Sequence, residues 1–137
     1  LAKEEMGHFR MVFRELQQRG YELGRERKDS YVNELMKFLR QKGKGAEETL
    51  ADKLLFAAMI EARSCERFKV LSENIADKDL ASFYAELMAS EAGHYTLFLK
   101  LARQYGKRKD VDEKWQKLLT FEAEVMKNLG NPELIHG

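Results

Sequence analysis

Two identically spaced pairs of glutamate and histidine, each within a helical repeat of apolar residues, constrain this chain more than any other feature. The pairs are Glu5 with His8 and Glu91 with His94, and in both a glycine precedes the histidine. Positions i and i+3 lie on one face of a helix, so each pair presents a carboxylate beside an imidazole. Because both pairs fall on apolar stripes, we predict that they face the interior of a helical bundle.

A third glutamate lies on an apolar stripe between the two pairs. Glu61 is in line with Leu54, Ala58, Cys65 and Phe68, whereas Glu66 falls on a different stripe and is predicted to lie outside the site. A carboxylate among apolar side chains is costly unless a partner neutralises it. Three such carboxylates close together would take up protons or bind cations, and two histidines among them favour a transition metal such as iron or manganese over calcium.

The spacing by itself is suggestive rather than diagnostic, because glutamate occupies 17 of the 137 positions. Glu133 and His136 share the spacing, but they follow Gly130-Asn131-Pro132, a strong helix stop, and we interpret that match as coincidence. Two Glu-x-x-His pairs with a glutamate from each of two further helices form the ligand set of ferritin-like di-iron bundles. The competing interpretation is that both histidines are core residues satisfied by salt bridges.

Composition indicates a single all-α domain over residues 1–137. The chain has one proline and nine glycines, and Leu, Ala, Glu and Lys are abundant. The formal net charge of +1 does not indicate a nucleic-acid binder. The single cysteine, Cys65, excludes an internal disulfide and fits a reducing, cytoplasmic setting. No apolar run is long enough to span a membrane, and we find no signal peptide.

Five helices are expected from the apolar periodicity. Their predicted ranges are 1 to 20 or 24, 30 to 40, 47 to 73, 77 or 79 to 106, and 110 onwards. The expected caps are Ser30 for the second helix, Asp77 or Asp79 with Gly106 for the fourth, and the Asp110–Glu113 capping box for the fifth. The last helix is predicted to bury Leu118, Phe121, Val125 and Trp115.

Other residues near the predicted site allow two interpretations each. Glycine before each histidine costs about 1 kcal/mol in a helix interior, which favours a close helix approach beside the ligands. Cys65 is predicted to pack rather than to ligate. Tyr84 and Tyr95 could hydrogen-bond to the ligands or fill the core. Arg63 and Arg67 could face a polynucleotide, but we expect them to face solvent.

Two segments carry basic residues without acidic ones, although the chain as a whole is balanced. They contain Lys37, Arg40, Lys42 and Lys44, and Lys100, Arg103, Lys107, Arg108 and Lys109. They could form an RNA-binding surface. They could equally be solvated helix ends with cations that suit the helix dipole.

One run of residues is distinctive as written, Glu61-Ala62-Arg63-Ser64-Cys65-Glu66-Arg67-Phe68. With Ser90-Glu91-Ala92-Gly93-His94-Tyr95 and the Glu4-to-Phe9 segment, it resembles the MiaE family, the tRNA-(2-methylthio-N6-isopentenyladenosine) hydroxylases. The resemblance covers most of the chain. It implies a ferritin-like four-helix bundle with extra helices, in which Glu5, His8, Glu61, Glu91 and His94 are the metal ligands.

The resemblance also implies what such a protein does. It would be a non-haem di-iron monooxygenase that uses two iron ions and molecular oxygen to hydroxylate the isopentenyl group beside the tRNA anticodon. Its partners would be the tRNA anticodon loop and an external electron donor, because no flavin or nicotinamide motif is present. The family has an upstream helix with a further glutamate ligand, and we expect this sequence to begin after that helix.

Two other classes of protein remain as alternatives. One is a ferritin-like iron-storage or peroxide-scavenging protein that does not touch RNA, for which the basic segments would have no use. The other is a helical bundle whose motifs hold no metal, which metal analysis would distinguish at once.

Overall fold

The chain folds entirely into helices over the residues that the computed structural model describes, 1–25, 28–39 and 45–129. The helices are α1 (Ala2–Gln18), α2 (Ser30–Leu39), α3 (Ala46–Asn74), α4 (Lys78–Tyr105) and α5 (Arg108–Leu129). The all-α prediction is therefore confirmed, and every expected helix is present close to its predicted range.

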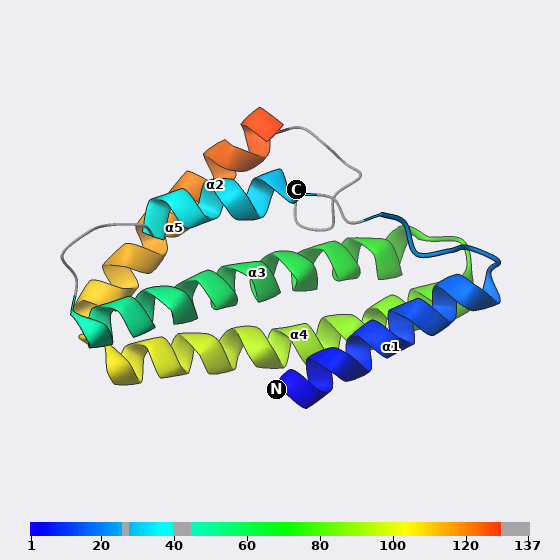
Figure 1. Cartoon of the computed structure of the whole chain (residues 1–137), viewed down its shortest axis with the longest axis horizontal. Helices are drawn as coiled ribbons and strands as arrows, with labels where there is room; N and C mark the ends of the chain where they lie inside the picture. Colours follow the sequence, from blue (N-terminus) through cyan, green and yellow to red (C-terminus); the bar gives the residue numbers. More distant parts are fainter. Residues whose placement is uncertain (26–27, 40–44, 130–137) are drawn as a thin grey trace.

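Helices α3 and α4 form a long antiparallel hairpin that the other helices flank (Figure 1). Helices α2 and α5 pack against α3 on one side, and α1 runs alongside α4 on the other. The short connection between α3 and α4 forces the two helices to run antiparallel, as the sequence predicts. Asp77 caps α4 by accepting hydrogen bonds from the backbone amides of Asp79 and Leu80, both at 3.0 Å. Arg19 donates to the same carboxylate over 2.8 Å, so the end of α1 is tied to this cap.

The hydrophobic core lies between α2, α3, α5 and the second half of α4. Its largest members are Tyr31, Leu35, Leu55, Leu99, Trp115 and Leu118. Leu118, Val125 and Trp115 are buried as predicted, and Phe121 is partly buried against them. Helix α1 contributes no buried residue. Its apolar stripe was expected to be internal, but Leu1 and Val12 are 45% and 38% exposed.

The helix ends differ from expectation at two places, and at a third the structure selects Gly20 over Gly24 as the predicted end of the first helix. Helix α2 is capped by Asp29, whose Oδ1 accepts from the Val32 amide over 3.1 Å, so the Ser30 cap is wrong. Helix α5 begins at Arg108, which places Asp110 inside its first turn rather than at its start. Helix α1 stops at Gln18, because Gly20 has φ +76° and the Tyr21 amide bonds back to the Leu16 carbonyl over 3.0 Å. The predicted end of the second helix, residue 40, lies outside the described residues.

The glycines of the two motifs do not mediate a close helix approach. In the described residues, a Cβ placed on Gly7 or Gly93 would have no contact within 4 Å, so that prediction is wrong. Gly106 is different, because a Cβ there would lie 2.7 Å from Val111 Cγ2. None of the described helices is long and apolar enough to cross a bilayer.

Candidate metal centre

Three helices bring all five predicted ligand residues to one place. Glu5 and His8 come from α1, Glu61 from α3, and Glu91 and His94 from α4. Glu5, Glu61, Glu91 and His94 each offer a ligand atom, and these atoms all lie within 4.8 Å of one another. His8 joins them, with its Nδ1 3.2 Å from Glu91 Oε1 and its ring centroid 5.8 Å from that of His94. That these residues bind metal stays a prediction.

The helical spacing of each motif explains how its two side chains meet. His94 Nδ1 lies 3.2 Å from Glu91 Oε2 within α4 and 2.9 Å from Glu5 Oε1 of α1. The side chains of Glu91 and His94 are only 7% and 8% exposed, so this end of the cluster is shielded from water. Side chains of the two motifs therefore contact each other between α1 and α4.

The raised pKa of Glu61 shows most clearly that negative charges are crowded together in the cluster. Burial, a hydrogen bond with Glu91 and the charges of Glu91 and Glu5 together raise the pKa of Glu61 to about 8. Carboxylates held this close cannot all be ionised unless a cation or a proton lies between them.

Two buried polar atoms of the cluster, Glu5 Oε1 and His8 Nδ1, have ion-pair contacts but make no hydrogen bond of acceptable geometry among the described residues. Buried polar atoms are rarely left unsatisfied. Donor atoms that share one ion at about 2.1 Å lie up to about 4.2 Å apart, so the spacing within the cluster suits one ion or two bridged ions.

The remaining sequence predictions near the site have mixed outcomes. Glu66 lies outside the cluster with a side chain 64% exposed, as predicted. Cys65 is partly buried and does not belong to the cluster, which fits a packing role. Tyr84 stacks on Phe68 and Tyr95 packs against Trp115, so both lie among aromatic side chains. Glu133 and His136 lie outside the described residues.

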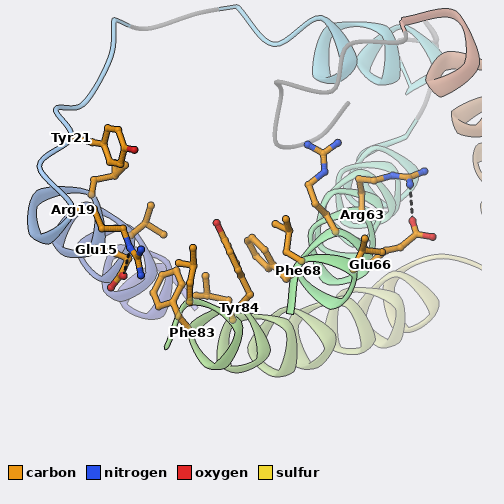
Figure 2. Close-up of a pocket in the computed structure, with 15 residues that line it drawn as sticks. Glu15, Arg19, Tyr21, Arg63, Glu66, Phe68, Phe83 and Tyr84 are labelled. Carbon is orange, nitrogen blue, oxygen red and sulfur yellow. Dashed lines mark hydrogen bonds and ion pairs between the residues drawn. The ribbon is translucent and has the colours of Figure 1, made fainter. Parts of the chain in front are cut away.

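An open, mostly apolar groove adjoins the cluster, with α4 at its base and α1 and α3 as its walls (Figure 2). Its volume is about 740 Å³. Phe68, Phe83 and Tyr84 project into it, and Arg19 and Arg63 lie at its sides. None of the five cluster residues lines it. Its lining residues Val12 and Leu87 lie four residues from His8 and Glu91, which is about 6 Å along each helix.

A buried carboxylate on α5 was not predicted from the sequence. Glu122 is 4% exposed and accepts hydrogen bonds from Arg63 of α3 and Tyr31 of α2. The prediction that Arg63 faces solvent is therefore wrong. The sequence did contain an indication that Glu122 is buried, because Glu122 lies between Leu118 and Val125 on the apolar stripe of its helix.

Acidic neighbours surround part of the second basic segment. Arg103 bonds to Asp112 over 2.7 Å, and Arg108 and Lys109 lie 3.9 Å from Asp112 and Glu113. In the first basic segment Lys37 pairs with Glu34, while Arg40, Lys42 and Lys44 lie outside the described residues. These contacts fit the solvated-helix interpretation as well as the RNA-binding one.

Comparison with known proteins identifies relatives along the whole chain. The family described as tRNA-(MS2IO6A)-hydroxylase (MiaE) matches residues 1–137. A Pseudomonas putida protein named tRNA 2-(methylsulfanyl)-N(6)-isopentenyladenosine(37) hydroxylase is 41% identical over 113 residues, which are 81% of this chain and 52% of that protein. A Salmonella typhimurium protein of the same name is 41% identical over 104 residues, 76% of this chain and 37% of its own. The chain thus spans about half, or less, of the length of these curated relatives.

A solved structure supports the same fold. It is described as protein 43 with aldehyde deformylating oxygenase activity from Synechococcus, and it superposes with a TM-score of 0.84 at 31% identity. The match covers 99% of this chain and 68% of that one. The arrangement of the helices is therefore ferritin-like.

Proposed function

Since this chain belongs to the MiaE family, we propose that it is the metal-binding part of an oxygen-dependent non-haem di-iron monooxygenase. Its substrate is the isopentenyl group of 2-methylthio-N6-isopentenyladenosine next to the tRNA anticodon. The observation that carries the proposal is the convergence of both Glu-x-x-His motifs and Glu61 on one cluster. Donor atoms of Glu5, Glu61, Glu91 and His94 lie within 4.8 Å of one another, and His8 contacts Glu91. The curated relatives are named as hydroxylases of this nucleoside, which favours this function over iron storage or peroxide scavenging.

In this proposal the five cluster residues hold two iron ions, and bound iron supplies the redox chemistry that activates oxygen. The three carboxylates Glu5, Glu61 and Glu91 offset three of the four positive charges of two ferrous ions. His8 and His94 add neutral nitrogen donors, and the buried side chain of Leu87 limits the access of water beside Glu91.

The charge that remains supports the further ligand which the family resemblance implies. Four positive charges less three negative ones leave one, which a fourth carboxylate would cancel. A helix that brought this glutamate would pack in the groove between α1 and α3, because the groove is apolar and two cluster-bearing helices form its walls.

The substrate base lies in a single-stranded loop, so it can reach a pocket without the opening of a duplex. The electrons come from an external donor, which we propose to be a separate protein or small reductant.

The test compares two glutamates of α4. Glu91→Ala should abolish iron binding and hydroxylation of an anticodon stem-loop that carries the modified adenosine. Glu86→Ala, at an exposed position of the same helix, should change neither. The measurements are iron content and hydroxylated nucleoside after digestion, with the full-length protein used for activity. Full iron content and activity in the Glu91 variant would refute the ligand assignment, whereas iron binding without any hydroxylation by the parent protein would refute the substrate.

A further inference from the structure

A buried polar contact outside the cluster joins three helices at one carboxylate. Arg63 Nε of α3 donates to Glu122 Oε1 over 2.8 Å, and Arg63 Nη2 contacts the same oxygen. Tyr31 of α2 donates to that oxygen over 3.2 Å. The other end of the guanidinium, Nη1, donates to Glu66 Oε2 over 2.6 Å. We call Arg63, Glu122 and Tyr31 the α3 clamp.

Burial restricts the orientations that the side chains of the α3 clamp can adopt. Tyr31 and Glu122 are 0% and 4% exposed, and the side chain of Arg63 is 21% exposed. Arg63 and Glu122 form an ion pair in which two guanidinium nitrogens contact one carboxylate oxygen. A guanidinium that bonds through several nitrogens at once admits one orientation only. Rotation of α3 about its axis would break these bonds and leave a buried charge without a partner.

The α3 clamp lies on the opposite face of α3 from the candidate ligand of that helix. Glu61 and Arg63 are two residues apart, which is a rotation of about 200° at 3.6 residues per turn. Glu61 faces Glu91 and Glu5, and ligand atoms of the three carboxylates lie within 4.8 Å of one another, so like charges there repel. A small rotation of α3 would relieve this repulsion and carry Glu61 out of the cluster.

We propose that Arg63, Glu122 and Tyr31 are positioning residues that hold the rotation of α3, so that Glu61 faces the ligands of α1 and α4. The inference rests on the proposed metal centre and extends it to three residues outside the cluster, of which Arg63 also lies at the side of the groove. Groups behind the ligands that fix their orientation commonly change metal affinity by 10- to 100-fold.

The chain offers a matched control in a second buried ion pair between the same two helices. Lys114 of α5 contacts Asp52 of α3, and Asp52 is 5% exposed. Asp52 lies nine residues before Glu61, which is about 13 Å along the helix. A change at Asp52 therefore weakens the contact between α3 and α5 at a distance from the cluster.

The experiment measures Co²⁺ binding to the metal-free full-length protein by the visible absorption of bound cobalt, with urea unfolding in parallel. Glu122→Gln should lower the Co²⁺ affinity by about tenfold and alter the absorption bands. Asp52→Asn should lose comparable stability and keep the parent affinity and spectrum. The double variant Arg63→Met with Glu122→Leu removes the polar contacts but fills their space, so it should unfold no more easily than the parent yet bind Co²⁺ more weakly. It serves as the decisive variant if Glu122→Gln does not fold.

Two results would overturn the proposal in distinguishable ways. Parent-like Co²⁺ affinity in Glu122→Gln or in the double variant would refute the positioning role and leave the metal centre standing. Absence of Co²⁺ binding by the full-length parent protein would refute the proposed metal centre and the α3 clamp with it.

Discussion

At the scale of single residues, the cluster contains more negative charge than its protein surroundings neutralise. Burial and the neighbouring carboxylates Glu91 and Glu5 raise the pKa of Glu61 to about 8. In the absence of metal, and between pH 4.5 and about 8, the folded chain therefore holds a proton on Glu61, whereas the unfolded chain has released it. This difference links folding to pH.

We predict that the metal-free chain becomes less stable as pH rises from about 4.5 to about 8, the ordinary and the raised pKa of Glu61. Below this range Glu61 is protonated in both states, and within it only the folded state keeps the proton, so the free energy of unfolding falls. Above about 8 the loss is complete. Glu61→Gln removes the titrating group and should reduce the pH dependence. Urea unfolding of both proteins at pH 5 and pH 8 measures the effect. An equal decline in parent and variant would show that other groups cause it.

At the scale of secondary-structure elements, the two motif glycines and Gly106 have opposite surroundings. Gly93 lies in the interior of α4 with open space where its Cβ would be. Gly106 ends the same helix, and a Cβ there would lie 2.7 Å from Val111 Cγ2 and 3.1 Å from Ala51 Cβ. Glycine therefore costs helix stability at the first position and permits close packing at the second.

We predict that Gly93→Ala stabilises the chain by about 0.5–1 kcal/mol, because alanine loses less conformational freedom in a helix. Gly106→Ala should destabilise it by about 1–3 kcal/mol, since the new methyl group meets buried Val111. Urea unfolding of the metal-free proteins at one pH measures both changes. A destabilised Gly93→Ala protein would show that another element packs closely against that face in solution.

At the scale of the whole molecule, the groove and the second basic segment lie on opposite sides of the cluster along α4. The lining residues Leu80 to Leu87 precede Glu91, whereas Lys100 to Lys109 follow His94. Lys100 is six residues beyond His94, about 9 Å along the helix. An RNA whose modified base reaches the cluster could thus lay its phosphates over either end of α4.

We predict that the basic segment contributes to RNA binding in the full-length protein. Replacing Lys107, Arg108 and Lys109 with alanine should weaken binding to an anticodon stem-loop and reduce its salt dependence, with a change in slope of about 0.7 for each lost phosphate contact. The measurement is a salt titration of the affinity.

The control for this prediction is Lys78→Ala, at the exposed start of α4 beyond the groove. It should leave the salt dependence unchanged. The reverse pattern, with an effect at Lys78 and none at the triple variant, would place the RNA over the groove instead.

Local patterns in the sequence determined the helices and the candidate ligands. The 3.6-residue periodicity and the absence of helix breakers defined five helices, and the connection before Asp77 defined the α3–α4 hairpin. The i, i+3 spacing placed a carboxylate beside an imidazole in each motif, and the stripe through Leu54 and Phe68 singled out Glu61 over Glu66. All of these are properties of one helix or of two consecutive ones, so they can be read without coordinates.

Contacts between helices distant in the sequence were decided only by the tertiary structure. Arg63 was expected to face solvent because its own helix does not show that Glu122, 59 residues later, lies against it. The open space at Gly93 and the contact of Arg103 with Asp112 of the next helix also depend on how the helices pack. The physical reason is that periodicity shows which face of a helix is apolar, whereas the rotation and packing of each helix against the others determine what that face meets.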